Sequence, residues 1–115
     1  MPYHGWVKRT FFAGLMGARR YLCSELVALK VNSVDTTVNL EEIWQDGAAF
    51  ESEDPVVDGA SVELRCGTAF FAGKVTQVER HEFGWRVEVE FSPLTPWNPE
   101  QFRPQHMLDV REIGG

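Results

Sequence analysis

The sequence predicts an all-β fold: a small six-stranded antiparallel β-barrel with a short N-terminal helix or loop and a proline-rich C-terminal arm. The first observation is the strict alternation over residues 85–92, where Trp85, Val87, Val89 and Phe91 share one face and polar residues occupy the other. The second is a series of short strand-like segments at nearly regular spacing, separated by turn residues. Because two strands alone are marginal in water, these segments are expected to complete one sheet or barrel.

The expected strands are short, and each is bounded by residues that favour turns. They cover residues 24–31, 37–43, 48–52, 62–66, 70–78 and 85–92. In the third strand Ala48 and Phe50 are expected to face inward. The last two strands form the clearest hairpin. There the polar run 79–82, followed by Phe83 and Gly84, reverses the chain, and glycine can take a positive φ in the turn.

The second strand changes the side to which its apolar residues point. Val38 and Leu40 share a face, whereas simple alternation places Ile43 on the other. Such a change of parity predicts a β-bulge near Glu41 and Glu42.

The N-terminal segment is basic and only weakly helical. Apolar residues recur at intervals of three and four within residues 2–17, which would give a short amphipathic helix. Gly14 and Gly17 weaken that helix by about 1 kcal/mol each relative to alanine, so a loop is the alternative. We therefore expect residues 1–20 to be a basic N-terminal segment that precedes a barrel over residues 21–92.

The character of the sequence changes after the sixth expected strand. Pro93, Pro96 and Pro99 exclude a central strand and favour an extended, semi-rigid arm over residues 93–115. Residues 100–110 would add one helical turn or an edge strand. The side chains expected to dock the arm onto the barrel are Trp97, Phe102, Met107 and Leu108.

Length and composition indicate one folded domain of 115 residues, with 43% hydrophobic and 24% charged residues. No apolar run approaches the roughly 20 residues of a membrane span. The short apolar run at residues 11–16 is followed by Arg19 and Arg20 rather than by a signal-peptide cleavage site. We therefore expect a cytoplasmic protein without membrane insertion.

Charge is distributed unevenly along the chain, whose net charge is −6. Up to Val31 there are five Lys and Arg residues against Glu25 alone, and the remainder is strongly acidic. A basic N-terminal part on an otherwise acidic chain is suited to binding a small anion at one place. The chain lacks the many basic residues along one face that contact phosphates in DNA or RNA binding, so we expect no nucleic-acid partner.

No residue pattern indicates catalysis or a metal centre. The chain has no nucleophile elbow, no Gly-rich phosphate loop and no cysteine placed with a histidine in a known local signature, so we expect no catalytic residue and no enzymatic activity. Cys23 and Cys66 could form a disulfide or a metal pair, but two small buried hydrophobic residues fit a cytosolic protein better. The three widely spaced histidines show no ligand pattern with them, so no metal site is predicted.

Three stretches together resemble the PilZ domain family: Arg19-Arg20, then residues 40–48 (LEEIWQDGA), then residues 84–91 (GWRVEVEF). The family is a bacterial six-stranded barrel that in many members binds the second messenger cyclic di-GMP. The resemblance covers about residues 16–92. It implies two signatures: two arginines separated by three residues before the first strand, and Asp or Asn, any residue, Ser, two residues and Gly on the second and third strands. In members that bind, the arginines grip phosphates and guanine faces, while the second signature holds a guanine edge.

The signatures are only partly kept in this chain. Arg20 fits the second arginine, but Met16 stands where the first is expected. Glu42 occupies the Asp or Asn position with a longer side chain, Trp44 replaces the Ser, and Gly47 matches. The resemblance therefore implies a degenerate nucleotide site, in which Trp44 either blocks the ligand or stacks on a base.

Three hypotheses follow from these observations. The first is a degenerate PilZ-like domain that acts as a protein-interaction or regulatory module in bacterial second-messenger signalling, with a protein partner and no cofactor. The second is a receptor that still binds cyclic di-GMP through the adjacent arginines and the outer barrel face. The third is an unrelated small barrel that binds single-stranded nucleic acid, which the acidic body disfavours. The candidate ligand-binding residues are Arg19, Arg20, Glu42, Trp44 and Gly47.

Overall fold

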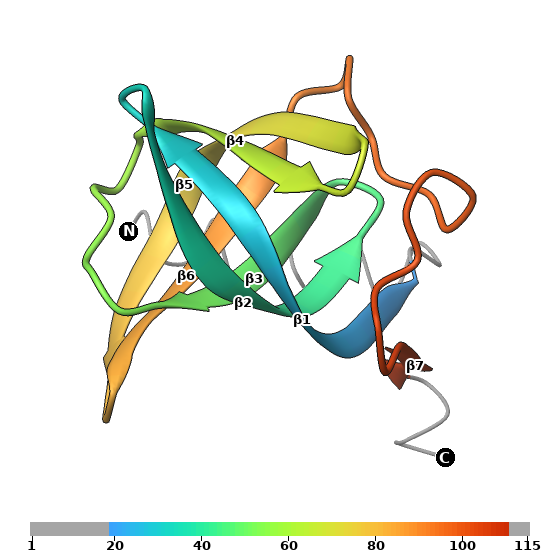
Figure 1. Cartoon of the computed structure of the whole chain (residues 1–115), viewed down its shortest axis with the longest axis horizontal. Coiled ribbons are helices and arrows are strands. Elements are labelled where there is room, and N and C mark those ends of the chain that lie inside the picture. Colours follow the sequence, from blue (N-terminus) through green and yellow to red (C-terminus); the bar gives the residue numbers. More distant parts are fainter. Residues whose placement is uncertain (1–18, 111–115) are drawn as a thin grey trace, which may run out of the picture.

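The computed structural model describes residues 19–110 and shows a closed antiparallel barrel of six strands, which confirms the predicted fold class (Figure 1). The strands are β1 (Arg20–Val31), β2 (Val34–Trp44), β3 (Gly47–Ser52), β4 (Ser61–Cys66), β5 (Ala69–His81) and β6 (Gly84–Phe91), followed by the two-residue β7 (Leu108–Asp109). Neighbouring strands pair in the order β2-β3-β6-β5-β4-β1, and pairing of β1 with β2 closes the ring. The N-terminal helix or loop expected over residues 2–17 lies outside the described residues.

The hairpin of β5 and β6 is tighter than the sequence pattern predicts. The reversal was expected to begin at residue 79, whereas β5 continues to His81 and pairs there with Gly84. The added length brings Arg80 opposite Trp85, with the guanidinium carbon 5.3 Å from the centroid of the indole. Such a cross-strand contact favours the extended ladder over an early turn.

β1 is also longer than predicted, since it begins at Arg20 instead of residue 24. The additional residues pair with the end of β2, Arg20 opposite Trp44 and Tyr21 opposite Ile43. Arg20, which was expected in the basic N-terminal segment, is therefore part of the barrel wall.

The predicted β-bulge on β2 is confirmed. The register with β3 shifts between Leu40 and Glu42, and both Leu40 and Ile43 are fully buried in the core. The bulge inserts one extra residue between them, so Glu41 and Glu42 are both left for the outer face. Two neighbouring carboxylates on one face of a strand are possible only because of this irregularity.

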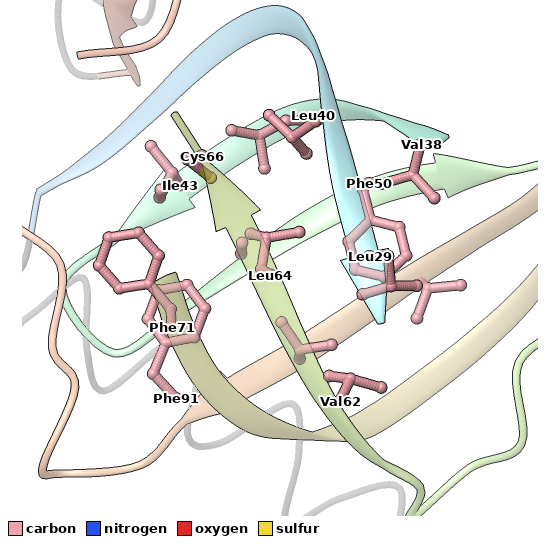
Figure 2. Packing of buried hydrophobic residues seen from close by; sticks show 14 of the residues in the cluster. Leu29, Val38, Leu40, Ile43, Phe50, Val62, Leu64, Cys66, Phe71 and Phe91 are labelled. Atoms are coloured by element: carbon pink, nitrogen blue, oxygen red, sulfur yellow. The ribbon is translucent and has the colours of Figure 1, made fainter. Parts of the chain in front are cut away.

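The interior of the barrel is filled by apolar side chains that converge from all the strands of the ring (Figure 2). The largest fully buried side chains include Leu29, Leu40, Phe50, Leu64 and Phe71. Phe71 and Phe91 stack with their ring centroids 5.1 Å apart. A small barrel of this kind is packed inside, so chemistry is to be sought on its outer wall.

The two cysteines contribute to packing. Cys66 belongs to the core and Cys23 packs against it, both as free thiols. Burial raises the pKa of each thiol to about 12, and the nearby carboxylate of Glu25 adds to both shifts. A thiol with such a pKa stays protonated at neutral pH and is a poor nucleophile.

The C-terminal arm docks on the N-terminal half of β1. Trp97 is buried, makes an edge-to-face contact with Tyr21 at 5.5 Å between centroids, and donates a hydrogen bond from Nε1 to the Phe102 carbonyl at 2.8 Å. β7 then pairs with Tyr21 and Leu22 of β1. The expectation that Leu108 anchors the arm is wrong, because it sits on the outward side of β7 and remains exposed.

Candidate functional site

Four of the five predicted site residues meet on the outer wall of the barrel. Arg20 pairs with Trp44 across β1 and β2, and Trp44 pairs with Gly47 across β2 and β3. Glu42 lies two residues before Trp44 on the same strand, so its side chain points to the same face. The strands therefore place a guanidinium, a carboxylate and an indole side by side next to a glycine.

Arg20 is held between the other two side chains. Its Nε lies 2.8 Å from Glu42 Oε2, and its Cζ lies 4.0 Å from the centroid of the Trp44 ring. Only 17% of the Arg20 side chain is exposed. Although the ion-pair distance is short, the N–H does not point at the carboxylate, so Nε is a buried donor without a hydrogen-bond acceptor in the described part of the chain. The contact is therefore Coulombic, supplemented by a cation–π interaction.

Gly47 provides the room in which the indole lies. A Cβ atom at this position would be 3.0 Å from Cε2 and Cζ2 of Trp44, and on the other side it would overlap the carbonyl oxygen of Val89 on β6. The indole thus packs flush against the backbone of β3. Only glycine allows this close approach of ring, strand and neighbouring strand.

Arg86 on β6 completes the site, although the sequence analysis did not single it out. Its Nη1 lies 3.4 Å from Glu41 Oε1, and its Nη2 lies 3.2 Å from Glu42 Oε1. Glu42 consequently bridges two guanidinium groups, those of Arg20 and Arg86. The predicted bulge was the available signal, because it places both carboxylates on the face to which Arg86 points.

Glu88 lies on the polar face of β6, where the alternation over residues 85–92 predicts a solvated side chain, and this prediction is wrong. Only 7% of Glu88 is exposed, and its Oε2 lies 3.7 Å from Nη2 of Arg86. It pairs across the ladder with Ala49, which in turn pairs with Glu42. Ala49 is fully buried although it alternates with the inward Ala48, which is expected when long charged side chains fold over a small residue.

Arg19 does not join the other predicted residues. Its Nη1 lies 3.7 Å from Oδ2 of Asp109 on β7, and 60% of its side chain is exposed. Successive residues along an extended chain point to opposite sides, so adjacent arginines cannot grip one ligand from the same direction. In this arrangement Arg19 therefore does not lie beside Arg20 on the face of the site.

We call these residues the outer-face cluster: Arg20, Glu41, Glu42, Trp44, Arg86 and Glu88. The cluster holds two guanidinium groups and three carboxylates, linked by ion pairs of 2.8–3.7 Å. Beside Arg86 the wall is hollowed by only about 190 Å³, over Gln77 and Glu79. This hollow is smaller than the roughly 300–1,000 Å³ of typical small-molecule sites.

The carboxyl group of Glu41 has a raised pKa. Burial raises this pKa, and the charge of Glu51 together with a hydrogen bond between the two carboxyl groups raises it further. Arg86 and His81 act in the opposite direction without cancelling the shift. At neutral pH an ionised Glu41 is therefore held in surroundings that favour its protonated form.

Glu41→Gln should raise the melting temperature at pH 7, because glutamine mimics the protonated carboxyl group. The folded pKa of Glu41 lies above its unfolded value, so the stability from protonation is present below the unfolded pKa of about 4.3 and is lost as pH rises through the folded pKa. The gain of the variant over wild type should accordingly shrink as the pH approaches 4. Thermal unfolding followed by circular dichroism between about pH 4 and pH 7 measures it.

Glu42→Gln is the matched control for this prediction. Glu42 contacts two guanidinium groups, so neutralising it should lower the melting temperature at pH 7. If Glu41→Gln instead lowered the melting temperature at pH 7, its ion pair with Arg86 would outweigh the repulsion by Glu51.

Comparison with known proteins adds no relative: the chain matches no family model, no curated protein and no solved structure. Among residues 19–110 there is no helix of the length and hydropathy required for a bilayer span. The same residues contain no group of three or more His, Cys, Asp or Glu side chains arranged to hold a metal ion. The protein is therefore described by its fold and its site, a closed β-barrel with an ion-paired outer-face cluster.

Proposed function

We propose that this chain is a non-enzymatic, PilZ-like signalling domain that works as a protein-interaction or regulatory module in bacterial second-messenger signalling. The observation that supports this proposal best is that Arg20 already contacts Glu42 and Trp44 of the same chain. In the family that the sequence resembles, this arginine grips the ligand. Here its guanidinium is 2.8 Å from the Glu42 carboxylate and lies over the Trp44 ring, so its charge is already paired within the chain.

The charge of the outer-face cluster supports the same proposal. Cyclic di-GMP carries two anionic phosphates, whereas the cluster has one more carboxylate than guanidinium groups. A ligand that recruited Arg20 would have to separate it from Glu42 and leave that buried carboxylate with one partner fewer. Separating this ion pair would cost affinity, because a largely buried carboxylate that loses a cationic partner is destabilised.

A receptor for cyclic di-GMP is the second candidate, and two observations favour it. Nε of Arg20 is a buried donor with no hydrogen-bond acceptor among the described residues, so a phosphate oxygen would satisfy it. Stacking of Arg20 on the indole would also leave a flat cationic surface that suits a guanine base. In this alternative, Arg20 and Trp44 would contact the dinucleotide directly.

Isothermal titration calorimetry of the whole chain with cyclic di-GMP separates the two candidates. The proposed function predicts no heat of binding at ligand concentrations of tens of micromolar. Arg20→Ala and, as a control, Arg65→Ala on the distant β4 are titrated in parallel. Binding that is lost in Arg20→Ala but kept in Arg65→Ala would establish the receptor and overturn the proposed module.

A further inference from the structure

A second, larger hollow lies on the outer wall on the other side of Glu41 from the Arg20 contact. It has a volume of about 490 Å³ and is lined by Leu26, Thr37, Asn39, Glu41, Glu51, Ser52, Glu53 and Phe83. We call it the acidic groove. In the sheet Leu26 pairs with Asn39, and Asn39 pairs with Glu51, so the groove runs across β1, β2 and β3 at one level of the barrel. This volume is within the range of typical small-molecule sites.

The charges that line the groove have one sign. Three of its residues are glutamates, and none of the lining residues in the described chain is Lys, Arg or His. Of the three glutamates that line the groove, only Glu41 pairs with Arg86, and neither Glu51 nor Glu53 has an ion-pair partner within 4.0 Å in the part of the chain that the structure describes. The Glu41 and Glu51 carboxyl groups lie close enough to share a hydrogen bond. Carboxylates gathered in this way create a negative potential that attracts a cationic group.

Two large apolar side chains bracket these carboxylates. Leu26 on β1 is 71% exposed, and Phe83 in the turn between β5 and β6 is 83% exposed. In the strand order, β2 and β3 separate β1 from the hairpin of β5 and β6, so the two side chains stand on opposite sides of the groove. Single exposed apolar residues need no explanation, but an apolar pair around a charged hollow resembles the anchors of a binding site.

We propose that the acidic groove binds a basic peptide segment of a partner protein, with a Lys or Arg side chain at the carboxylates and an apolar side chain at each end, on Leu26 and Phe83. This inference rests on the proposed interaction function and names the chemistry of its partner. Strands lie about 4.8 Å apart, so the groove spans roughly 10–15 Å from β1 to the hairpin. An extended peptide rises about 3.3 Å per residue and turns every second side chain to the same face, so the matching pattern is apolar, any residue, basic, any residue, apolar over about five residues.

The same geometry disfavours other occupants. Nucleic acid would bring phosphates against Glu41, Glu51 and Glu53, which is repulsive at short range. A small cationic molecule without apolar ends would leave Leu26 and Phe83 unused. The contribution of both apolar ends therefore distinguishes a peptide from a simple cation.

Fluorescence anisotropy of the whole chain with synthetic peptides tests the inference. The probe is a fluorescein-labelled peptide with the core Leu-Ser-Arg-Ser-Phe, and the comparison peptides have the cores Ser-Ser-Arg-Ser-Ser and Leu-Ser-Glu-Ser-Phe. We expect saturable binding of the probe below about 1 mM, at least tenfold weaker binding of the serine peptide, and none of the acidic one. Raising the salt from about 0.05 M to about 0.5 M should weaken binding of the probe, because exposed charges are screened.

Variants locate the binding site. The double variant Glu51→Gln with Glu53→Gln should lower the affinity for the probe at least tenfold. The single variant Phe83→Ser should do the same. Glu100→Gln and Phe70→Ser are matched controls, since both residues are exposed and lie outside the groove. Melting temperatures show that each variant is folded. No binding by wild type, equal binding by the groove variants, or equal binding of the serine peptide would each overturn the inference.

The outcomes also separate this inference from the proposed function. If the chain neither binds cyclic di-GMP nor binds the probe, the inference fails and the proposed function stands. If cyclic di-GMP binds through Arg20 while the probe still binds through Glu51 and Glu53, the proposed function fails and the groove stands.

Discussion

Replacing Gly47 with alanine should lower the free energy of unfolding by about 3 kcal/mol, the upper part of the range for overpacked sites. The added Cβ would overlap the carbonyl oxygen of Val89, which is backbone and can move only if the ladder between β3 and β6 yields. It would also press on the Trp44 ring at 3.0 Å. Urea unfolding followed by circular dichroism measures the change.

Gly59→Ala is the control that separates packing from backbone strain. Gly59 has a φ of +85°, but a Cβ there would meet nothing within 4 Å. Its substitution should cost only about 1–2 kcal/mol for the left-handed backbone. A loss at Gly47 no greater than the loss at Gly59 would mean that β3, β6 and the indole are not packed as closely as the structure has them.

This packing also changes the weight of Gly47 as a sign of function. In the sequence, Gly47 was the one position of the second signature that matched without change. The structure gives it a second reason to be glycine, since Trp44 and the Val89 carbonyl both need the space. A match that packing alone explains carries little information about a ligand. Arg20 and Glu42 are therefore the residues on which the question of nucleotide binding depends.

The barrel could be predicted from the sequence because alternation and parity are local properties of a strand. The period of two identified the strands, and the change of parity between Leu40 and Ile43 predicted the bulge that the structure contains. The ends of the strands were less predictable. β1 begins at Arg20 because β2 offers pairing partners up to Trp44, and such pairing is not visible in either segment alone.

The outer-face cluster could be predicted only in part, for a similar reason. Alternation says on which side a residue lies, but it does not say which side chains of other strands lie there with it. Arg86 and Glu42 are 44 positions apart, and Arg86 reaches Glu42 only through the register of β2, β3 and β6. Glu88 was taken as solvated because its own strand showed nothing to cover it. Charged residues on an outer face can form a nearly closed network once neighbouring strands supply partners.

Replacing Arg86 with methionine should lower the free energy of unfolding at pH 7 by about 3 kcal/mol, near the lower end of the range for breaking a buried ion pair. Methionine keeps much of the apolar stem but removes the charge that lies near Glu41, Glu42 and Glu88. Since 25% of the Arg86 side chain is exposed, solvent relieves part of the loss. The measurement is urea unfolding at pH 7, with Arg65→Met as the control. Arg65 pairs with Glu63 at the surface, so its substitution should change stability little.

Coupling between variants then tests why Arg86 matters. If the role of Arg86 is to offset neighbouring carboxylates, Glu41→Gln should stabilise the Arg86→Met protein more than it stabilises wild type. In the Arg86→Met protein no guanidinium at position 86 offsets the repulsion between Glu41 and Glu51. A double-mutant cycle at pH 7 measures that difference. The difference should shrink as the pH approaches 4, where the carboxyl group of Glu41 takes up a proton in either background. Equal effects of Glu41→Gln in both backgrounds would instead mean that the charge of Arg86 acts on Glu42 and Glu88 and does not offset Glu41.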